Sequence, residues 1–443
     1  MTINTNKATN YFLFLLACAT SLFCSQATSS PLGKWTLMVY MEAGNDLEVF
    51  APRNIRQMQQ VGSNENISIL VQHNTFEKDQ YHSTTYLIEK GDKKILKQHN
   101  SSTHTGEKNL VEFCCDCIEK YPAEHYALVF WNHGTGIIEP VCRTSLSSED
   151  LFSLQDVPEL FEKDNKGFMP FQSNKATSQR PAYKGICFDD ESGKFLSEKH
   201  VCRALKTICS TALNNKKFDL IGFDACLMSM IEVALALEPY ADLMVASQDV
   251  ERGTGWNYQY VLSPFLSNRM RPSDLGKHIV ESYHKAYYKI PDFTLSCVLL
   301  EAVQPLVETA SKIALLLQKV LLTTDNKKLK LAVKISRNKH LCTYFDEPEF
   351  VDLYHFYKNL QEHFEMVTPC PFVQELVENL TQARRLIEQA VHANTVGSAY
   401  PHAKGLSIYF PERTIHSSYR RCCFAARTHW HIFLKTYLSA YKK

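Results

Sequence analysis

Five short apolar runs constrain the fold of this chain more strongly than any other feature of its sequence. Within each run the hydrophobic residues follow one another almost without interruption, at residues 35–41, 67–72, 126–131, 218–223 and 243–246. Strands of this kind are covered on both faces, which is typical of a parallel sheet. Helix-like patterns separate the runs, at residues 49–60, 110–119, 197–212 and 227–237. Strands that alternate with helices predict βαβ units, and therefore an α/β sandwich with a mainly parallel central sheet.

The pattern changes after about residue 300. Apolar residues then recur at three- and four-residue spacing, at residues 303–322, 351–363 and 372–393, which indicates amphipathic helices. We therefore expect one α/β domain over residues 32–300 and a mostly helical C-terminal region over 301–443. The short apolar run at 405–410 predicts a strand that the C-terminal region returns to the main sheet, and residues 84–89 are expected to form an edge strand.

The first residues of the chain have the composition of a targeting segment. Lys7 precedes an uncharged apolar run over residues 11–23, and small residues follow up to Ala27. This pattern is typical of a secretory signal peptide, and the run is short for a membrane-spanning helix of about 20 residues. The alternatives are a retained membrane anchor and a lipoprotein anchored at Cys18. We expect residues 1–27 to be removed and the mature chain to be exported to the periplasm, the cell surface or the medium, without stable membrane insertion.

Net charge and cysteine content bear on whether the chain binds nucleic acid or a metal ion. The formal net charge is +1, which gives no global electrostatic reason to expect nucleic acid as a partner. Of the fifteen cysteines, Cys18 and Cys24 precede Ala27, which leaves an odd thirteen and at least one unpaired thiol. Cys114, Cys115 and Cys117 cluster in a helix-like stretch. Adjacent and i+2 positions do not share a helix face, so no metal site is predicted there.

Two of the predicted strands end in residues that can perform chemistry. Residues 127–136 read Ala-Leu-Val-Phe-Trp-Asn-His-Gly-Thr-Gly, so that a buried strand leads to His133 and Gly134. Residues 218–228 lead in the same way to Asp224 and Cys226. Catalytic groups of parallel α/β sheets lie at the carboxyl ends of the strands, so neighbouring strands would bring His133 and Cys226 together. The alternatives are a hydrogen-bonded structural histidine and a thiol buried in the core.

These residue types fit acyl transfer from an amide to a thiol. A thiolate is the competent nucleophile, and an imidazolium or a helix N-terminus lowers the pKa of a thiol. The helix-like run after Cys226 predicts such a helix N-terminus. His133 would share the thiol proton and later protonate the leaving amine. The backbone amides of Gly134 and Cys226 are candidates for holding the oxyanion. No Gly-x-Ser-x-Gly, His-Glu-x-x-His or phosphate-loop motif competes with this pair.

The chain resembles the clostripain family of cysteine peptidases, which is related in fold to caspases, gingipains and legumains. The matching segments follow one another in order over most of the mature chain, at residues 37–46, 130–136, 185–190, 223–228, 246–249, 253–256 and 405–411. The resemblance implies a caspase-like α/β/α sandwich and a thioacyl-enzyme mechanism. It assigns the catalytic histidine to His133 and the catalytic cysteine to Cys226.

The resemblance also implies cleavage of polypeptides after Arg or Lys. A basic P1 side chain needs a carboxylate in its pocket, and Asp224 matches the acidic position of the family. The alternative for Asp224 is a cap of the helix that follows.

The second pocket segment departs from the family pattern, Pro-Gly-x-Gly-Trp. Arg252 replaces the proline, and Thr254 stands at x, which is often acidic. Asp249 and Glu251 are candidates for additional negative charge, which Arg252 would offset. Trp256 either forms a pocket wall or packs in the core.

A polar insert at about residues 139–184 separates the histidine and cysteine segments. Relatives are often matured by a cut in this interval, so we expect the zymogen to cleave itself at Lys163, Lys166 or Lys175. The alternative is a passive surface insertion.

No cofactor is expected to be required. Some relatives use calcium, and Asp189, Asp190 and Glu191 have the ligand type that calcium prefers, but a solvated acidic turn is the better explanation of these residues and no metal site is assigned. Two further readings of the function stay open at this point: a catalytically silent relative that binds peptides, and a cysteine-dependent amidase acting on a small substrate.

Overall fold

The computed structural model describes residues 34–77, 80–101, 106–139, 186–189, 194–322, 327–366 and 371–441. The predicted signal peptide and lipoprotein cysteine lie outside these residues, as do almost the whole insert and Asp190 and Glu191. The lysines proposed for self-cleavage, Lys163, Lys166 and Lys175, are likewise outside the described part of the chain.

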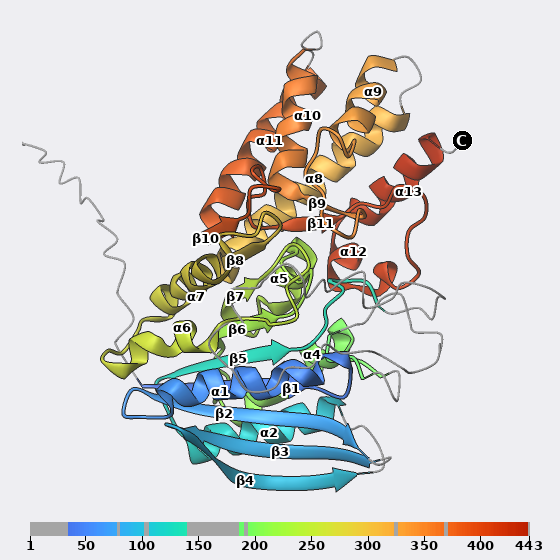
Figure 1. Ribbon diagram of the computed structural model, residues 1–443. Helices are drawn as coiled ribbons and strands as arrows, with labels where there is room; N and C mark the ends of the chain where they lie inside the picture. Colours follow the sequence, from blue (N-terminus) through green and yellow to red (C-terminus); the bar gives the residue numbers. More distant parts are fainter. Residues whose placement is uncertain are drawn as a thin grey trace, which may run out of the picture. The chain divides into compact units, whose positions relative to one another are not determined.

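The core of the molecule is a nine-stranded sheet in the order β10-β8-β7-β6-β5-β1-β2-β3-β4 (Figure 1). The five strands predicted from the apolar runs are its five central strands, and they are parallel to one another: β7 (Ala241–Ala246), β6 (Phe218–Asp224), β5 (His125–Trp131), β1 (Trp35–Glu42) and β2 (Ile67–Glu77). Antiparallel strands extend the sheet at both sides: β3 (Gln80–Glu89), β4 (Asp92–Ser101), β8 (Thr294–Leu299) and β10 (Val391–Val396). The mixed α/β sandwich expected from the sequence is therefore confirmed.

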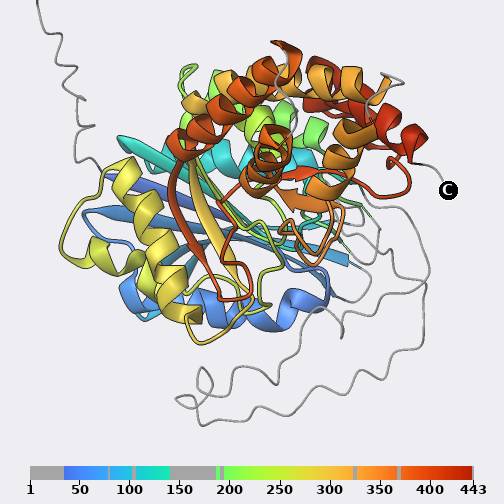
Figure 2. The same ribbon diagram turned by 90° about the horizontal axis from the view of Figure 1, so that it is seen from above.

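Helices cover both faces of the sheet, which explains why its central strands are largely apolar (Figure 2). In β1, Met38 and Tyr40 belong to one core, and Leu37, Val39 and Met41 belong to the other. The second core is closed by α1 (Ala51–Val61), α6 (Tyr258–Leu262) and α7 (Pro272–Tyr287). The first core is closed by α2 (Gly106–Lys120), α4 (Glu198–Thr211) and α5 (Ile231–Leu237), and it continues into the C-terminal helices.

The C-terminal region contains the helices α8 (Val303–Leu322), α9 (Lys327–Ser336), α10 (Leu353–Glu365), α11 (Pro371–Ala390), α12 (Cys423–Arg427) and α13 (Trp430–Ala440). The periodic segments expected at 303–322, 351–363 and 372–393 correspond to α8, α10 and α11, whereas α9, α12 and α13 were not predicted. In the described part of the chain, no helix combines the length and the apolar character that crossing a membrane requires.

Two predictions about strands were wrong. Residues 84–89 lie inside β3, which is not an edge strand because the lysine-rich β4 pairs with its outer side. The run at 405–410 contains β11 (Ser407–Tyr409), which pairs with β9 (Phe350–Asp352) in a separate two-stranded sheet. The strand that the C-terminal region contributes to the main sheet is β10. We expected its first residues to continue the preceding helix, but α11 ends at Ala390.

Candidate functional site

His133 and Cys226 follow adjacent parallel strands and line one pocket. In the β5–β6 register Trp131 is opposite Asp224, and the Asn132 amide continues the pairing with a 3.3 Å hydrogen bond to the Asp224 carbonyl oxygen. Two residues beyond each strand, His133 and Cys226 both border a pocket whose other lining residues are Leu47, Trp131, Asn132, Asp224, Ala225, Glu251, Arg252 and Gly253. The two predicted catalytic residues therefore lie at the same pocket, as expected for residues that follow the carboxyl ends of adjacent parallel strands.

Gly134 sets how closely the two strand ends approach each other. A Cβ atom placed on Gly134 would lie 2.2 Å from the Cys226 carbonyl oxygen, well inside van der Waals contact. The amides of Gly134 and Cys226 are not hydrogen-bonded to any other described residue. Both amides are thus available for a developing oxyanion, the role predicted for them.

Cys226 is buried, and its sulfur is held by the segment that follows β7. The Glu251 amide donates a hydrogen bond to Cys226 Sγ over 3.3 Å. Burial raises the pKa of the thiol well above its ordinary value, although the Glu251 amide opposes this effect. The nearby carboxyls of Glu251, Asp249 and Asp346 raise this pKa further. The resting side chain is therefore a thiol, and its activation requires a base.

The turn after Cys226 differs from the expected helix. Leu227 has a φ of 63°, a left-handed conformation that ends regular structure, and α5 begins at Ile231. Cys226 therefore does not lie at a helix N-terminus, and the prediction that a helix would lower its pKa was wrong. The turn is fixed from two sides. The Leu227 amide donates to the Asp249 carbonyl oxygen, and Ser407 of β11 donates to the Ser229 carbonyl oxygen through both its amide and its hydroxyl.

His133 is buried and forms a close contact with a residue that the sequence analysis did not identify. Its Nε2 lies 2.7 Å from Oδ1 of Asp46. Asp46 opens the short 3₁₀ helix η1 (Asp46–Phe50), which Asn45 caps by accepting a hydrogen bond from the Leu47 amide. Asp46 also follows a predicted strand, but its proximity to His133 depends on the pairing of β1 with β5, in which Met41 is opposite Trp131.

Asp224 and Glu251 form a buried pair of carboxyls at the pocket. Asp224 accepts hydrogen bonds from the Trp256 amide at 3.0 Å and from the Tyr258 hydroxyl at 2.9 Å. Glu251 is 3% exposed, and in the described structure neither of its carboxyl oxygens has a hydrogen-bond partner. The Asp224 carboxyl, the Trp256 indole and the Ala225 amide lie near Glu251, but not in hydrogen-bonding geometry. Burial raises the pKa of both carboxyls, and the charge of Asp224 raises that of Glu251 further.

The other residues predicted to bind substrate are not among those that line this pocket. Asp249 accepts a hydrogen bond from the Asp346 amide and connects the Cys226 turn to the C-terminal region. The Thr254 hydroxyl lies 2.7 Å from the Tyr287 hydroxyl. Trp256 is 1% exposed, packs against Gly222 and belongs to the core.

Arg252 lines the pocket, but its charge is partly neutralised. Its guanidinium lies 2.5 Å from Asp292 Oδ1. The offset that we expected Arg252 to impose on the acidic pocket is reduced by this ion pair.

No cluster suited to a metal ion is present among the described residues. Asp189 is fully buried, and its Oδ2 accepts a hydrogen bond from the Tyr81 hydroxyl. Cys114 and Cys117 are buried in α2, where each is a free thiol. The question of calcium binding by Asp190 and Glu191 stays open, because these two residues are not described.

The sequence of this chain matches that of a known peptidase family over most of its length. The model of the clostripain family, peptidase C11, matches residues 39–166 and 171–435. Clostripain from Hathewaya histolytica is 26% identical over 264 residues, which are 54% of this chain and 43% of that protein. The match therefore spans less than half the length of this curated relative.

Two solved structures share the fold over most of their length. One is a secreted C11 cysteine protease from Bacteroides thetaiotaomicron in complex with an irreversible peptide inhibitor. It has a TM-score of 0.56 and 17% identity, with 91% of this chain and 99% of that chain covered. The other is an inactive zymogen C11 protease from Parabacteroides distasonis, with a TM-score of 0.56, 17% identity and coverage of 92% and 99%.

Proposed function

Because this chain belongs to the clostripain family, we propose that it is a cysteine endopeptidase in which Cys226 is the nucleophile and His133 transfers the proton. The observation that carries the proposal is the shared pocket at the ends of β5 and β6, where Gly134 lies against the Cys226 carbonyl. A buried thiol with a raised pKa needs an adjacent base, and His133 is the histidine that lines this pocket.

The proposed reaction has two steps. His133 takes the Cys226 proton as the sulfur attacks the scissile carbonyl carbon, and the Gly134 and Cys226 amides stabilise the oxyanion. The carbon–nitrogen bond breaks, and His133 gives the proton to the leaving amine, which leaves a thioacyl-enzyme. Water, deprotonated by His133, then hydrolyses the thioester and restores the Cys226 thiol.

We further propose that the pocket selects Arg or Lys at P1. Glu251 and Asp224 are buried carboxyls that meet no cation among the described residues, and a guanidinium or ammonium would favour their ionised forms. Glu251 supplies unoccupied oxygens, whereas Asp224 is already held by the Trp256 amide and the Tyr258 hydroxyl. Glu251 is therefore the stronger candidate for direct contact with the P1 cation.

The test is hydrolysis of internally quenched peptides that differ only at P1. The chain without residues 1–27 is expected to cleave after Arg and Lys, and Cys226→Ala is expected to abolish cleavage. Cys423→Ala is the matched control, because Cys423 is a partly exposed thiol outside the pocket. A folded wild-type chain without hydrolysis under any condition tested would instead indicate the silent, peptide-binding alternative.

We also propose that the enzyme is exported and cleaves its own insert at Lys163, Lys166 or Lys175. Both flanks of the insert are tied to the body of the protein: the Leu196 amide donates to the Ile186 carbonyl oxygen, and Glu139 pairs with Arg421. The two pieces would stay together, because β5 and β6 are neighbours in one buried sheet.

Denaturing gels and mass spectrometry test this proposal. Two fragments are expected for the wild type and one intact chain for Cys226→Ala. An uncut wild-type chain with full activity would contradict activation by self-cleavage.

A further inference from the structure

We propose that Asp46 is a positioning residue that makes Nδ1 of His133, rather than Nε2, the atom that exchanges a proton with Cys226. This inference rests on the proposed function, because it assigns a role to a neighbour of the proposed base. It extends the pair of His133 and Cys226 to a unit of three residues from three adjacent strand ends.

The contact itself determines which ring nitrogen carries the proton. His133 Nε2 lies 2.7 Å from Asp46 Oδ1, within hydrogen-bond distance. An ionised carboxylate only accepts hydrogen bonds, so Nε2 must be the donor. A neutral imidazole has a single N–H, and its lone pair is then on Nδ1. Asp46 thereby selects the tautomer with the proton on Nε2, in which Nδ1 is the basic atom.

The local structure keeps Asp46 in place. Asn45 accepts a hydrogen bond from the Leu47 amide through Oδ1 and donates one to the Phe188 carbonyl oxygen through Nδ2. Asn132, next to His133, accepts a hydrogen bond from the Phe188 amide at 3.0 Å. The short segment at 186–189 thus connects the turn that carries Asp46 to the strand end that carries His133. A histidine partner held in this way restricts the orientation of the ring as well as its tautomer.

The charge of Asp46 has a separate consequence. A carboxylate near an imidazole favours the imidazolium over the neutral ring. Asp46→Asn keeps a side chain of the same size but removes this charge, and its amide group can also donate to Nε2 and select the other tautomer. We expect kcat to fall by roughly 10²-fold, the scale of general acid–base catalysis, while KM changes by less than about 3-fold. The limb of the pH–rate profile that reports imidazole ionisation is expected to move to lower pH.

Glu48→Gln is the matched control. Glu48 belongs to the same 3₁₀ helix, is exposed, and carries the same charge, so this variant removes one negative charge without touching His133. Its kcat and pH profile are expected to equal those of the parent. An Asp46→Asn enzyme with an unchanged profile, or one whose amplitude falls while both limbs stay in place, would overturn the positioning role.

A second measurement needs no change at Asp46. In ¹⁵N-labelled Cys226→Ala protein, the ring shifts of His133, assigned with a His133 variant, report the tautomer. Protonated Nε2 is expected, and protonated Nδ1 would overturn the inference. The proposed function and the proposed role of Asp46 can be contradicted independently. Retained hydrolysis by Cys226→Ala would contradict the proposed function. An Asp46→Asn enzyme with unchanged kcat and pH profile would contradict the role of Asp46 alone.

Discussion

A histidine–aspartate pair lies at each end of β5, with the aspartate from β6 at the amino end and from the turn after β1 at the carboxyl end. At the amino end, His125 Nδ1 lies 2.7 Å from Asp219 Oδ1, and the imidazole packs 5.0 Å from the Trp35 ring. At the carboxyl end, His133 Nε2 lies 2.7 Å from Asp46 Oδ1. The two imidazoles are similarly buried, and the two contact distances are the same.

The surroundings of the two pairs differ. The other carboxyl oxygen of Asp219 accepts a hydrogen bond from the Tyr126 amide, so Asp219 of β6 binds the first two residues of β5. His133 borders a pocket with Cys226 and two buried carboxyls, whereas His125 does not line that pocket. A short histidine–aspartate contact is therefore no sign of catalysis by itself. The polarity of the sheet, which collects functional groups at the carboxyl ends of its strands, separates the two pairs.

The largest effect is expected from removing each histidine in turn. His133→Ala should reduce kcat/KM by at least about 10³-fold, because loss of one member of a catalytic unit costs nearly as much as loss of all. His125→Ala should leave kcat/KM within about 3-fold and should lower the free energy of unfolding by about 1–3 kcal/mol through a lost buried hydrogen bond. Kinetics and urea unfolding of both variants measure this. Equal kinetic losses in folded variants would contradict the distinction drawn between the two ends.

A smaller effect on kcat/KM is expected from substitutions in the buried carboxyl pair of Asp224 and Glu251, which lies at the same end of β5 as His133. Glu251→Gln should weaken cleavage after Arg by about 2–5 kcal/mol in kcat/KM, the cost of losing one partner of a buried charge pair. Asp224→Asn should follow in the same direction by a smaller amount, because Asp224 already has two protein donors. The measurement is the ratio of kcat/KM for matched P1 Arg and P1 Leu peptides. An unchanged ratio in both variants would show that these carboxyls do not select P1.

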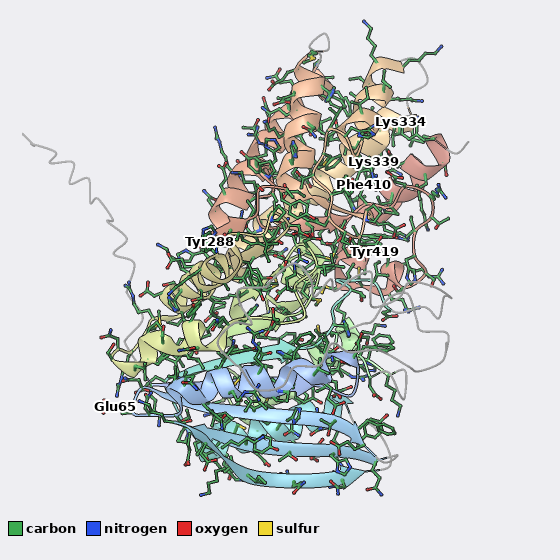
Figure 3. All side chains as sticks on the ribbon, viewed as in Figure 1. Glu65, Tyr288, Lys334, Lys339, Phe410 and Tyr419 are labelled. Atoms are coloured by element: carbon green, nitrogen blue, oxygen red, sulfur yellow. The ribbon has the colours of Figure 1, made fainter. Side chains whose placement is uncertain are left out.

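The smallest effect on catalysis is expected from a buried acid outside the pocket, which should change stability alone. Glu232 Oε1 accepts hydrogen bonds from the Tyr409 amide and the Tyr419 hydroxyl, and it thereby connects α5 to the C-terminal region. Figure 3 labels Tyr419 in that region. Burial raises the pKa of Glu232 to about 7. The folded state therefore holds a proton that the unfolded chain releases at lower pH, and the contribution of Glu232 to stability is lost as pH rises toward 7.

Glu232→Gln mimics the protonated form at every pH. The variant should exceed the parent in unfolding free energy by about 3 kcal/mol at pH 8, and the difference should vanish near pH 4. Its P1 selectivity should equal that of the parent, unlike that of Glu251→Gln. Denaturant unfolding at the two pH values provides the measurement, and a Gln variant less stable than the parent at pH 8 would show that the fold stabilises the ionised form of Glu232 instead of disfavouring it.

The parts of the fold that the sequence predicted are those specified by local burial. The central strands were found because both their faces are covered, which favours apolar residues on both faces of each strand. β4 was not found because its outer side is exposed and its lysines resemble a loop. The run around Ser407 was correctly expected to be a buried strand, but its partner is β9. The hydrophobicity of a segment indicates whether it is buried. The strand with which it pairs depends instead on tertiary contacts between segments far apart in the sequence.

The same limit applies to the site. His133, Gly134, Asp224 and Cys226 follow long apolar runs, so the strand ends on which they lie could be located in advance. Asp46 follows an equally clear run, but its relevance depends on β1 lying beside β5, which is a tertiary fact. Trp256 left two alternatives open because an aromatic residue near a pocket and one in the core look alike in sequence.

The brace between Ser407 and the Cys226 turn has a consequence for the newly made protein. Ser229 and Ser407 are 178 residues apart in the chain. At about 5–20 residues per second, a ribosome needs roughly 9–36 s to cover that interval. Throughout this time the chain already contains His133 and Cys226, but the turn after Cys226 is held only by the segment that follows β7 and lacks the brace from Ser407. The order of synthesis thus delays completion of this turn until Ser407 has been made.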